Sequence, residues 1–382
     1  MTSNLGLYVH WPWCVRKCPY CDFNSHAVTG KLPEQDYVNA LLADLRHAYR
    51  AVDGREVTSV FVGGGTPSLM SAEGFGALMS GVRSIVNLSA SAEITMEANP
   101  GTVGAERFRA YAQAGVNRIS IGIQSFSDAK LKALGRIHSR DEALAAIEAA
   151  KAVVDDVNLD VMFALPGQSM GELDEDLTLA LKAETSHLSF YELTIEEGTA
   201  FYKRVPDQLP DVDLAADMAD HVHETLVNAG FEHYEISAYA RPGHQCRHNS
   251  TYWTFGDYLG VGAGAHGKLT VDGQIVRTVR SANPRVYLHN VELGVFEAER
   301  RVVEKEDLPF EFMLNALRLR NGVLRDEWER HTGLGIDVID PVLTQLQKEG
   351  LLEKSERRIV PTELGRRFLS DLQERFLTVS VP

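Results

Sequence analysis

Three cysteines lie close together near the N-terminus, at Cys14, Cys18 and Cys21, and the chain has one other cysteine, Cys246. A Cys-x3-Cys-x2-Cys loop can bring three thiolates to one face of an iron–sulfur cube and leave the fourth iron without a protein ligand. An iron with an open position can bind and reduce a substrate. The spacing therefore predicts a [4Fe-4S] cluster that serves chemistry more than electron storage.

Zinc and a disulfide framework are the alternative interpretations of these cysteines. A structural zinc site usually takes four Cys or His ligands in paired spacings. The second pair is absent here, although His10 or His26 can in principle complete a site. A disulfide framework is not expected in a chain of 382 residues with four cysteines and no secretory signal. These features favour a reducing compartment, and we expect a cytoplasmic protein.

Composition limits the possible partners. The hydrophobic content of 44% and charged content of 24% are ordinary for a globular protein. The net charge of −15 disfavours nucleic acid as the main partner. No apolar run approaches the roughly 18 residues of a membrane span, so we expect no transmembrane segment. Peripheral membrane contact would then use a partner or a surface patch.

The first half alternates between β-rich and helical patterns. The predicted strands are Leu5–His10, Val57–Val62, Glu93–Glu97, Arg118–Ile123, Asn158–Leu165 and Leu188–Leu193. The predicted helices are Glu34–Val52, Ala72–Val86, Gly104–Ala114, Arg140–Val154 and Gly171–Glu184. Strict alternation of this kind predicts an α/β fold with a parallel sheet. Because a closed barrel has eight strands, we expect a partial, laterally open (β/α)6 barrel.

The alternation ends near residue 205, which suggests three parts. We expect the partial barrel at 1–205, a connecting α/β region at 206–300 and a C-terminal module at 301–382. The connecting region contains a predicted helix at Asp211–Ala229 and a strand-like segment at His233–Tyr239. In the tail, helical patterns are followed by a short hairpin, which is typical of a winged-helix-like module. Its charge is mixed, so an interaction or lid role is as plausible as nucleic-acid binding.

A glycine-rich run, Gly63-Gly64-Gly65-Thr66-Pro67, follows the second predicted strand. Glycines let the backbone approach a ligand closely, and its N–H and C=O groups can bind an amino-acid carboxylate or ammonium. A tight turn is the simpler alternative. A Walker-type phosphate loop is excluded because no Gly-Lys-Ser/Thr sequence follows.

Further polar residues lie in or near strand ends, where active sites of barrels gather. Glu97 can accept a hydrogen bond from a ligand ammonium or ribose hydroxyl, or is simply an exposed acid. Gln124 ends the fourth strand, and Arg136 can hold a carboxylate with two hydrogen bonds. Asp160 lies inside an apolar strand and requires a partner, for which a ligand hydroxyl is a candidate. Tyr20 can stack on an adenine or shield the cluster.

The second half contains Cys246-Arg247-His248-Asn249-Ser250-Thr251-Tyr252-Trp253. His and Cys are common ligands of haem iron, and the aromatic residues can flank a porphyrin. A packed histidine beside Tyr and Trp is the alternative, and the spacing alone favours it. The run Gly260–His266 is also glycine-rich but does not have the pattern of a dinucleotide site.

Taken together, the cysteine loop, the Gly63–Pro67 run and the barrel mouth resemble the radical S-adenosylmethionine superfamily. The resemblance implies a [4Fe-4S] cluster whose open iron binds S-adenosylmethionine and reductively cleaves it to a 5′-deoxyadenosyl radical. Further motifs narrow it to the coproporphyrinogen III oxidase-like group. They are Tyr8-Val9-His10, Glu97-x-Asn99-Pro100, Gly122–Phe126, Leu134-Gly135-Arg136-x-His138 and Leu165–Gln168. By that resemblance, S-adenosylmethionine is contacted by Tyr8, Gly64, Gly65, Thr66, Glu97, Gln124, Arg136 and Asp160.

Two departures separate the chain from the oxygen-independent oxidases of this group. Those enzymes carry a fourth cysteine where this chain has Phe23, and an extension before the cluster loop, which here starts at residue 14. Both departures, with His248-Asn249-x-x-Tyr252-Trp253, resemble the haem-chaperone branch. The resemblance implies that His248 serves haem binding, and that haem passes to recipient haem proteins such as those of membranes. The alternative is radical decarboxylation of coproporphyrinogen III to protoporphyrinogen IX.

Overall fold

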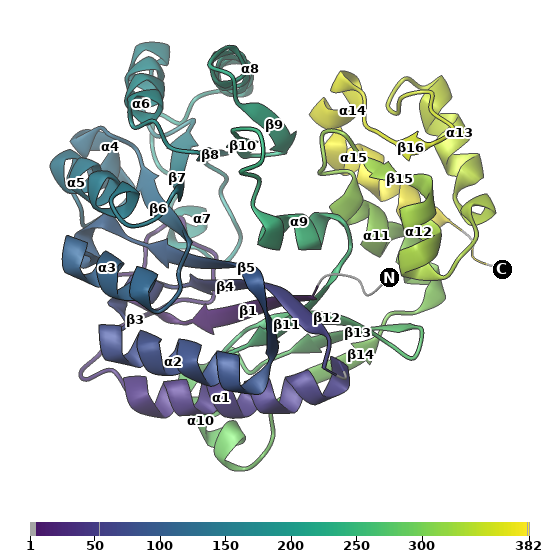
Figure 1. Ribbon diagram of the computed structural model, residues 1–382. Helices are drawn as coiled ribbons and strands as arrows, with labels where there is room; N and C mark the ends of the chain where they lie inside the picture. The colour runs from purple at the N-terminus through teal and green to yellow at the C-terminus, as the bar shows by residue number, and fades with distance from the viewer. Residues whose placement is uncertain (1–4, 53, 380, 382) are drawn as a thin grey trace.

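The computed structural model describes residues 5–52, 54–379 and 381. Its main sheet has twelve strands in the order β14-β13-β12-β11-β1-β4-β5-β6-β7-β8-β10-β9. The six central strands are parallel (Figure 1). They are β1 Leu5–Trp11, β4 Glu56–Gly64, β5 Asn87–Ala98, β6 Arg118–Gln124, β7 Asp156–Phe163 and β8 His187–Glu192. The predicted partial barrel is confirmed.

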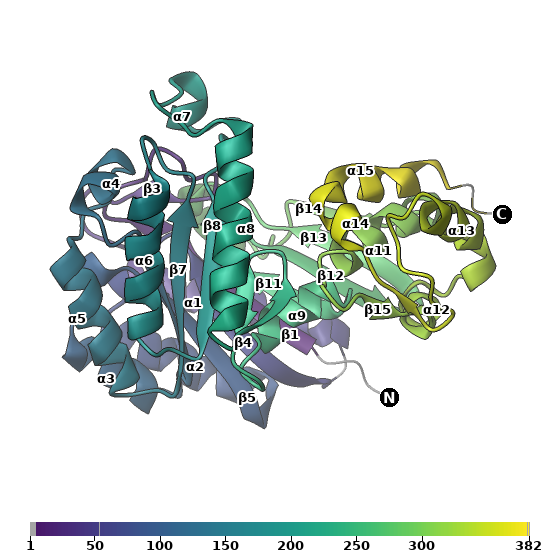
Figure 2. The same cartoon turned by 90° about the horizontal axis from the view of Figure 1, so that it is seen from above.

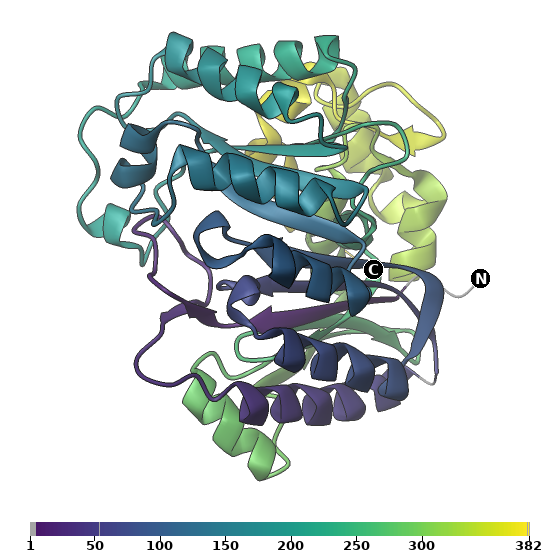
Figure 3. The same cartoon turned by 60° about the vertical axis from the view of Figure 1, so that its left-hand side comes forward.

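Helices cover the outer face of this sheet (Figure 3). They are α1 Glu34–Tyr49, α2 Ala72–Ile85, α3 Ala105–Gln113, α4 Asp128–Ala133, α5 Arg140–Lys151, α6 Met170–Lys182 and α8 Val212–Asn228. The short helix α7 Ala200–Lys203 lies instead beside the cysteine loop, where Phe201 N–H donates to the Pro19 carbonyl oxygen at 2.9 Å. Short 3-10 turns are η1 Arg50–Val52, η2 Pro67–Leu69 and η3 Pro100–Thr102. Ser139 and Ser169 begin α5 and α6 with capping boxes, each completed by a glutamate three residues later. The start of each helix is therefore encoded locally.

Side-chain alternation gives the sheet an apolar outer face and a polar inner face. On β7, Val157, Leu159 and Val161 join the main hydrophobic core beneath the helices. Asn158 and Asp160, on the opposite face, line a cavity inside the barrel. A barrel built in this way offers a polar interior to a ligand.

The second half of the chain extends the sheet on both sides. The added strands are β9 Glu232–Glu235, β10 Ala238–Ala240, β11 Asp257–Val261, β12 His266–Val271, β13 Gln274–Val279 and β14 Glu299–Val302. β11 lies parallel to β1, and the other five pair in antiparallel fashion. The segment His233–Tyr239, expected to be one strand, is two strands, because the chain turns at residues 236 and 237 so that Ala238 pairs with Glu235.

The C-terminal module lies beside the open side of the barrel (Figure 2). Its elements are η4 Lys305–Asp307, α11 Leu308–Ala316, β15 Val323–Leu324, α12 Arg325–Thr332, η5 Ile336–Val338, α13 Asp340–Lys348, β16 Arg358–Ile359, α14 Glu363–Arg367, α15 Leu369–Glu374 and η6 Arg375–Thr378. They share a second hydrophobic core centred on Phe312 and Trp328. That core also takes in Phe255, between α9 Arg247–Trp253 and β11. The boundaries at 205 and 300 stay predictions.

One more helix, α10 Pro284–Glu292, packs near α1 (Figure 1). Within the described ranges, no helix has both the length and the apolar character needed to span a bilayer.

Candidate cluster and cofactor site

The cysteine loop leaves the end of β1 and is closed at its base by backbone pairing. The short strand β2 Trp13–Cys14 lies parallel to β3 His26–Ala27. Cys14 is buried, whereas Cys18 and Cys21 are partly exposed, and all three thiols are free. The loop is therefore a fixed cradle with three available thiols, as a [4Fe-4S] cluster requires.

Hydrogen-bond donors surround the three sulfur atoms. Arg136 Nη1 lies 3.7 Å from Cys18 Sγ, and Ser25 Oγ lies 3.8 Å from Cys21 Sγ. Burial raises the pKa of the Cys14 thiol, and hydrogen bonds to Thr66 and Ser25 oppose that rise. These donors suit sulfur ligands that carry negative charge, so the residues present fit the cluster that the spacing predicts.

The two histidines considered for a zinc site have other partners. The Tyr8 hydroxyl lies 2.9 Å from His10 Nδ1, and His10 Nε2 lies 2.8 Å from the carbonyl oxygen of Asn24. His26 Nε2 lies 3.2 Å from Asn24 Oδ1. Among residues 5–52, 54–379 and 381, no group of three or more His, Cys, Asp and Glu side chains converges on a single metal ion. Cluster cysteines need not converge in this way, because each binds a different iron.

The glycine-rich run connects the cysteine loop to the barrel mouth. Gly64 has a φ of +112°, and a Cβ there would lie 2.4 Å from His10 Cε1. Gly65 N–H donates to the Trp11 carbonyl oxygen at 2.6 Å, and Thr66 N–H donates to that of Trp13 at 2.8 Å. Only glycine fits position 64, because φ is positive there and a Cβ would collide with the His10 ring.

Tyr8, Glu97 and Asp160 meet inside the barrel, where they line one inner cavity of about 180 Å³. Glu97 Oε2 accepts a hydrogen bond from Gly64 N–H at 2.9 Å, and burial raises the Glu97 pKa to about 8. Asp160 accepts hydrogen bonds from Ser120 at 2.8 Å and Asn158 at 2.9 Å. Burial raises the Asp160 pKa as well. Two carboxyl groups at this mouth can therefore receive the cationic and hydroxyl groups of a ligand.

Gln124 and Arg136 meet above Gly122. Gln124 has a φ of +66°, and a Cβ on Gly122 would lie 2.9 Å from Gln124 Nε2 and 3.3 Å from Arg136 Nη2. Arg136 Nη2 donates to the Gly122 carbonyl oxygen at 2.8 Å, and its buried Nε has no partner among the described residues. Tyr20 interacts with the Arg136 guanidinium, and its ring packs beside Phe201, with ring centroids 6.4 Å apart, at the edge of a small hydrophobic cluster.

His248 lies deep in the barrel wall. Its side chain is 0% exposed. Its Nδ1 lies 2.9 Å from Ser59 Oγ, and its Nε2 lies 2.7 Å from the Tyr252 hydroxyl. The ring also stacks on Phe61, with centroids 5.2 Å apart. Both ring nitrogens are thus occupied, and the role of His248 in haem binding stays a prediction.

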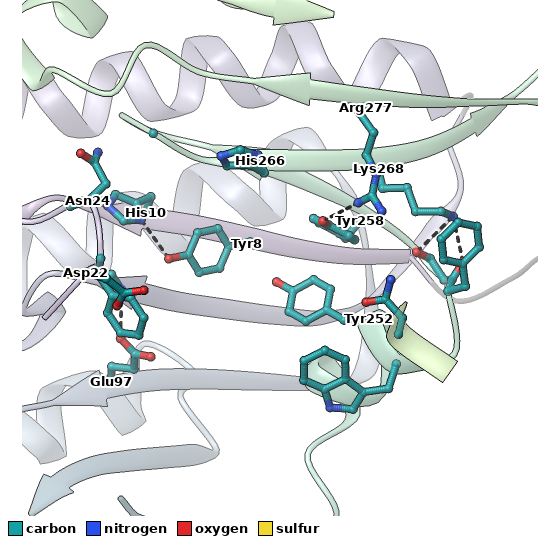
Figure 4. A pocket seen from close by; sticks show the side chains of 17 residues that line it. Tyr8, His10, Asp22, Asn24, Glu97, Tyr252, Tyr258, His266, Lys268 and Arg277 are labelled. Atoms are coloured by element: carbon teal, nitrogen blue, oxygen red, sulfur yellow. Dashed lines mark hydrogen bonds between the residues drawn. The ribbon is translucent and has the colours of Figure 1, made fainter. Parts of the chain in front are cut away.

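A larger cavity of about 620 Å³ opens from the barrel mouth toward the C-terminal module (Figure 4). It shares Tyr8, Glu97 and Tyr252 with the inner cavity. Its other walls come from the cysteine loop, β11, β12, β13 and α11. Its volume falls within the range of about 300–1,000 Å³ that proteins use for small-molecule and cofactor sites.

Sequence patterns did not indicate several residues of this cavity, among them Tyr258, His266, Arg277 and Asn315. The sequence signal for His266 is the glycine-rich run that it ends, which lacks the pattern of a dinucleotide site. It forms the turn between β11 and β12, so that His266 stands at the start of β12, beside β11 (Figure 4).

The cysteine loop on a partial parallel barrel defines the class of protein. Residues 8–180 match the radical SAM superfamily and residues 303–368 match the HemN C-terminal domain. The chain is 50% identical to heme chaperone HemW of Escherichia coli K12, over 98% of both chains. It is 32% identical to HemW of Bacillus subtilis, over 97% of this chain and 98% of that one. The chain belongs to the HemW family of radical SAM proteins, and this membership implies binding of a [4Fe-4S] cluster and S-adenosylmethionine.

A further sequence relative and a solved structure also match most of the chain. A mitochondrial radical S-adenosyl methionine domain-containing protein 1 from Bos taurus is 36% identical, over 92% of this chain and 82% of its own. The solved structure of coproporphyrinogen III oxidase (HemN) from Escherichia coli matches 98% of this chain and 90% of its own. The TM-score is 0.84 at 21% identity, so this match supports the architecture alone.

Proposed function

We propose that this protein is a haem chaperone, which binds haem and transfers it to recipient haem proteins. The names of the HemW relatives support this function. The observation that carries it is the cavity of about 620 Å³, whose walls include Tyr252, Trp253, Phe255 and Tyr258. Aromatic rings suit a large flat ligand with an apolar face.

Two details of the cavity fit a large ligand. The indole Nε1 of Trp253 is buried and has no hydrogen-bond partner within the described part of the chain. Phe23, which stands where the oxidases have a fourth cysteine, is 58% exposed and lines the cavity. An exposed aromatic ring at a cavity wall is available for contact with an apolar ligand.

The [4Fe-4S] cluster and S-adenosylmethionine would lie at the barrel mouth beside this cavity, which shares Tyr8, Gly64 and Glu97 with the proposed S-adenosylmethionine contacts. There Cys14, Cys18 and Cys21 would hold the cluster. The S-adenosylmethionine contacts would come from Tyr8, Gly64, Gly65, Thr66, Glu97, Gln124, Arg136 and Asp160, with Tyr20 near the cluster loop. The proposal places the protein in the cytoplasm, with membrane respiratory haem proteins among the recipients.

The decisive experiment uses anaerobically reconstituted protein with its cluster in place. We expect a haem titration, followed by absorption, to saturate at a defined stoichiometry. The same protein, given S-adenosylmethionine, a reductant and coproporphyrinogen III, should form no protoporphyrinogen IX. Turnover of that substrate would instead favour the oxidase alternative, and absence of saturable haem binding would overturn the chaperone function.

A further inference from the structure

A second cavity, of about 350 Å³, lies between the end of α1 and the strands β11 to β14. Among the described residues, only Tyr258 lines both this cavity and the large one. The described lining includes none of the cluster cysteines and none of the proposed S-adenosylmethionine contacts. Its volume falls within the range of about 300–1,000 Å³ that is typical of small-molecule sites. The cavity is therefore a separate place where a ligand can bind.

Three arginines line this cavity, although the chain has a net charge of −15. Arg50 begins η1, Arg280 follows β13, and Arg300 lies on β14. Glu297 is the one carboxylate in the part of the wall that the structure describes. Positive charge thus gathers in one cavity of a protein that is acidic overall, and this local excess favours an anionic ligand.

Arg280 is the buried member of this group, with a side chain that is 1% exposed. Its Nε and Nη2 each lie 3.0 Å from Oδ1 of the buried Asp44, which neutralises that edge of the guanidinium. Nη1 has no hydrogen-bond partner among the described residues, and it lies 4.0 Å from Oε1 of Glu297. Because buried donors are nearly always paired, Nη1 indicates an acceptor that the chain itself does not supply.

Glu297 does not fill the space between the cationic side chains. Its Oε1 lies 3.4 Å from Arg300 Nη1, 3.9 Å from His47 Nε2 and 4.0 Å from Arg280 Nη1. Hydrogen bonds between charged groups are usually about 2.7–2.9 Å long, so all three distances are long. One carboxylate oxygen is thus shared by three nitrogen atoms without close contact to any of them. A group that carries three oxygens on one centre can reach these nitrogen atoms together.

We propose that this cavity binds a phosphate group, with Arg280 Nη1 and Arg300 as its donors and Arg50 at the rim. Phosphate has the required oxygens on one centre, and the planar fork of arginine matches its geometry. Ala48 and Leu269 add apolar wall beside the charge, so an organic portion of the ligand also has a place. A soluble phosphate compound and a phospholipid headgroup share this chemistry. The site is independent of the proposed haem function.

The test measures binding of radiolabelled inorganic phosphate to the cluster-loaded protein by equilibrium dialysis at constant ionic strength. Arg300→Gln should weaken binding at least about tenfold, or about 1.4 kcal/mol, because it removes a donor. Glu297→Gln should tighten binding, because it removes the competing carboxylate and keeps a side chain of similar size. Arg285→Gln and Glu292→Gln are the matched controls. Both residues are exposed on α10, outside the cavity, and these variants should bind phosphate as wild type does.

A second arm uses the same variants in cosedimentation with phosphatidylglycerol vesicles, with phosphatidylcholine vesicles as the reference. If free phosphate does not bind but phosphatidylglycerol binds with the same order of variants, the phosphate group is that of a lipid. If wild type binds neither, or if either cavity variant matches its α10 control in both arms, the cavity is not a phosphate site. Arg280 is left unchanged because it pairs with the buried Asp44. Cluster absorption confirms that each variant is folded.

Discussion

Individual side chains inside the barrel differ in whether their polar atoms already have partners. His10, His187 and His248 are each held by two hydrogen bonds, which fixes the walls of the cavity. A buried group satisfied in this way rigidifies its surroundings, whereas a group without partners is available to a ligand. The Arg136 Nε and the Trp253 Nε1 have no partner among the described residues. Arg136 lies beside the cysteine loop and Trp253 lines the large cavity, so each of these two places keeps a donor available to a ligand.

The buried carboxyl group of Glu97 should make the stability of the protein depend on pH. Burial raises its pKa to about 8, above the value of about 4.5 in an unfolded chain. The folded protein therefore holds an extra proton between these two pH values, and its stability falls as pH rises toward 8. Relative to Glu97→Gln, wild type should lose on the order of 2–3 kcal/mol of unfolding free energy between pH 6 and pH 8.

Urea unfolding of both proteins at pH 6 and pH 8 measures this difference. Glu175→Gln is the matched control, since Glu175 is exposed on α6, and it should show no such change. S-adenosylmethionine should reduce the effect, because its cationic groups favour the charged carboxylate. Identical pH dependence in wild type and Glu97→Gln would show that the Glu97 pKa is ordinary.

The strands and helices of the barrel show what local sequence determines. The six strands and their helices follow from period-two and period-3.6 patterns and from capping serines, and these signals lie within each element. The placement of β11 beside β1 does not follow from such local signals, because it pairs residues that are far apart in the sequence, such as Leu5 and Asp257. For the same reason the cysteine loop and Glu97 could be predicted, whereas the cavity formed by β11, β12 and α11 could not.

Strand β12, which carries His266, depends on a buried ion pair. Lys268 Nζ lies 3.0 Å from Asp257 Oδ1 and donates to the Phe255 carbonyl oxygen at 2.8 Å. Both charged side chains are buried, and Arg55 also contacts Asp257 at 2.7 Å. Loss of one partner of a buried pair costs about 3–5 kcal/mol. We expect Lys268→Met to destabilise the protein by about 3 kcal/mol, because Arg55 still partners Asp257.

Urea unfolding of the cluster-loaded protein measures the effect. Lys132→Met is the control, because Lys132 is exposed on α4 and its substitution should change stability by less than about 0.5 kcal/mol. Equal stability of Lys268→Met and Lys132→Met would mean that the pair does not hold β12 to β11.

At the scale of the whole molecule, the C-terminal module completes the site that the barrel begins. Asn315 of α11 lines the large cavity, and Phe255, beside α9, belongs to the core of the module. Arg320 N–H donates to the Tyr234 carbonyl oxygen at 3.0 Å, which joins the module to β9. The cavity wall therefore depends on the contacts that hold the module against the barrel.

Arg318 is the side chain to test in this junction. Its guanidinium lies 4.1 Å from the centroid of the Trp253 ring and 3.5 Å from Glu235 Oε2. The Glu235 side chain is only 5% exposed, so removal of Arg318 leaves a buried acid without its cation. Residues that share such contacts couple by about 0.5–3 kcal/mol. A double-mutant cycle of Arg318→Ala and Glu235→Gln should give a coupling free energy in this range.

The exposed pair Arg330 and Asp326 on α12 is the matched comparison, and should couple by no more than about 0.5 kcal/mol. Because Arg318 also covers Trp253 in the cavity wall, Arg318→Ala should release haem faster than wild type in a stopped-flow transfer to apomyoglobin. Arg330→Ala should release it at the wild-type rate. Additive stability effects together with unchanged release would show that the module is held by its apolar contacts alone, and that the Arg318–Glu235 pair does not control the opening of the cavity.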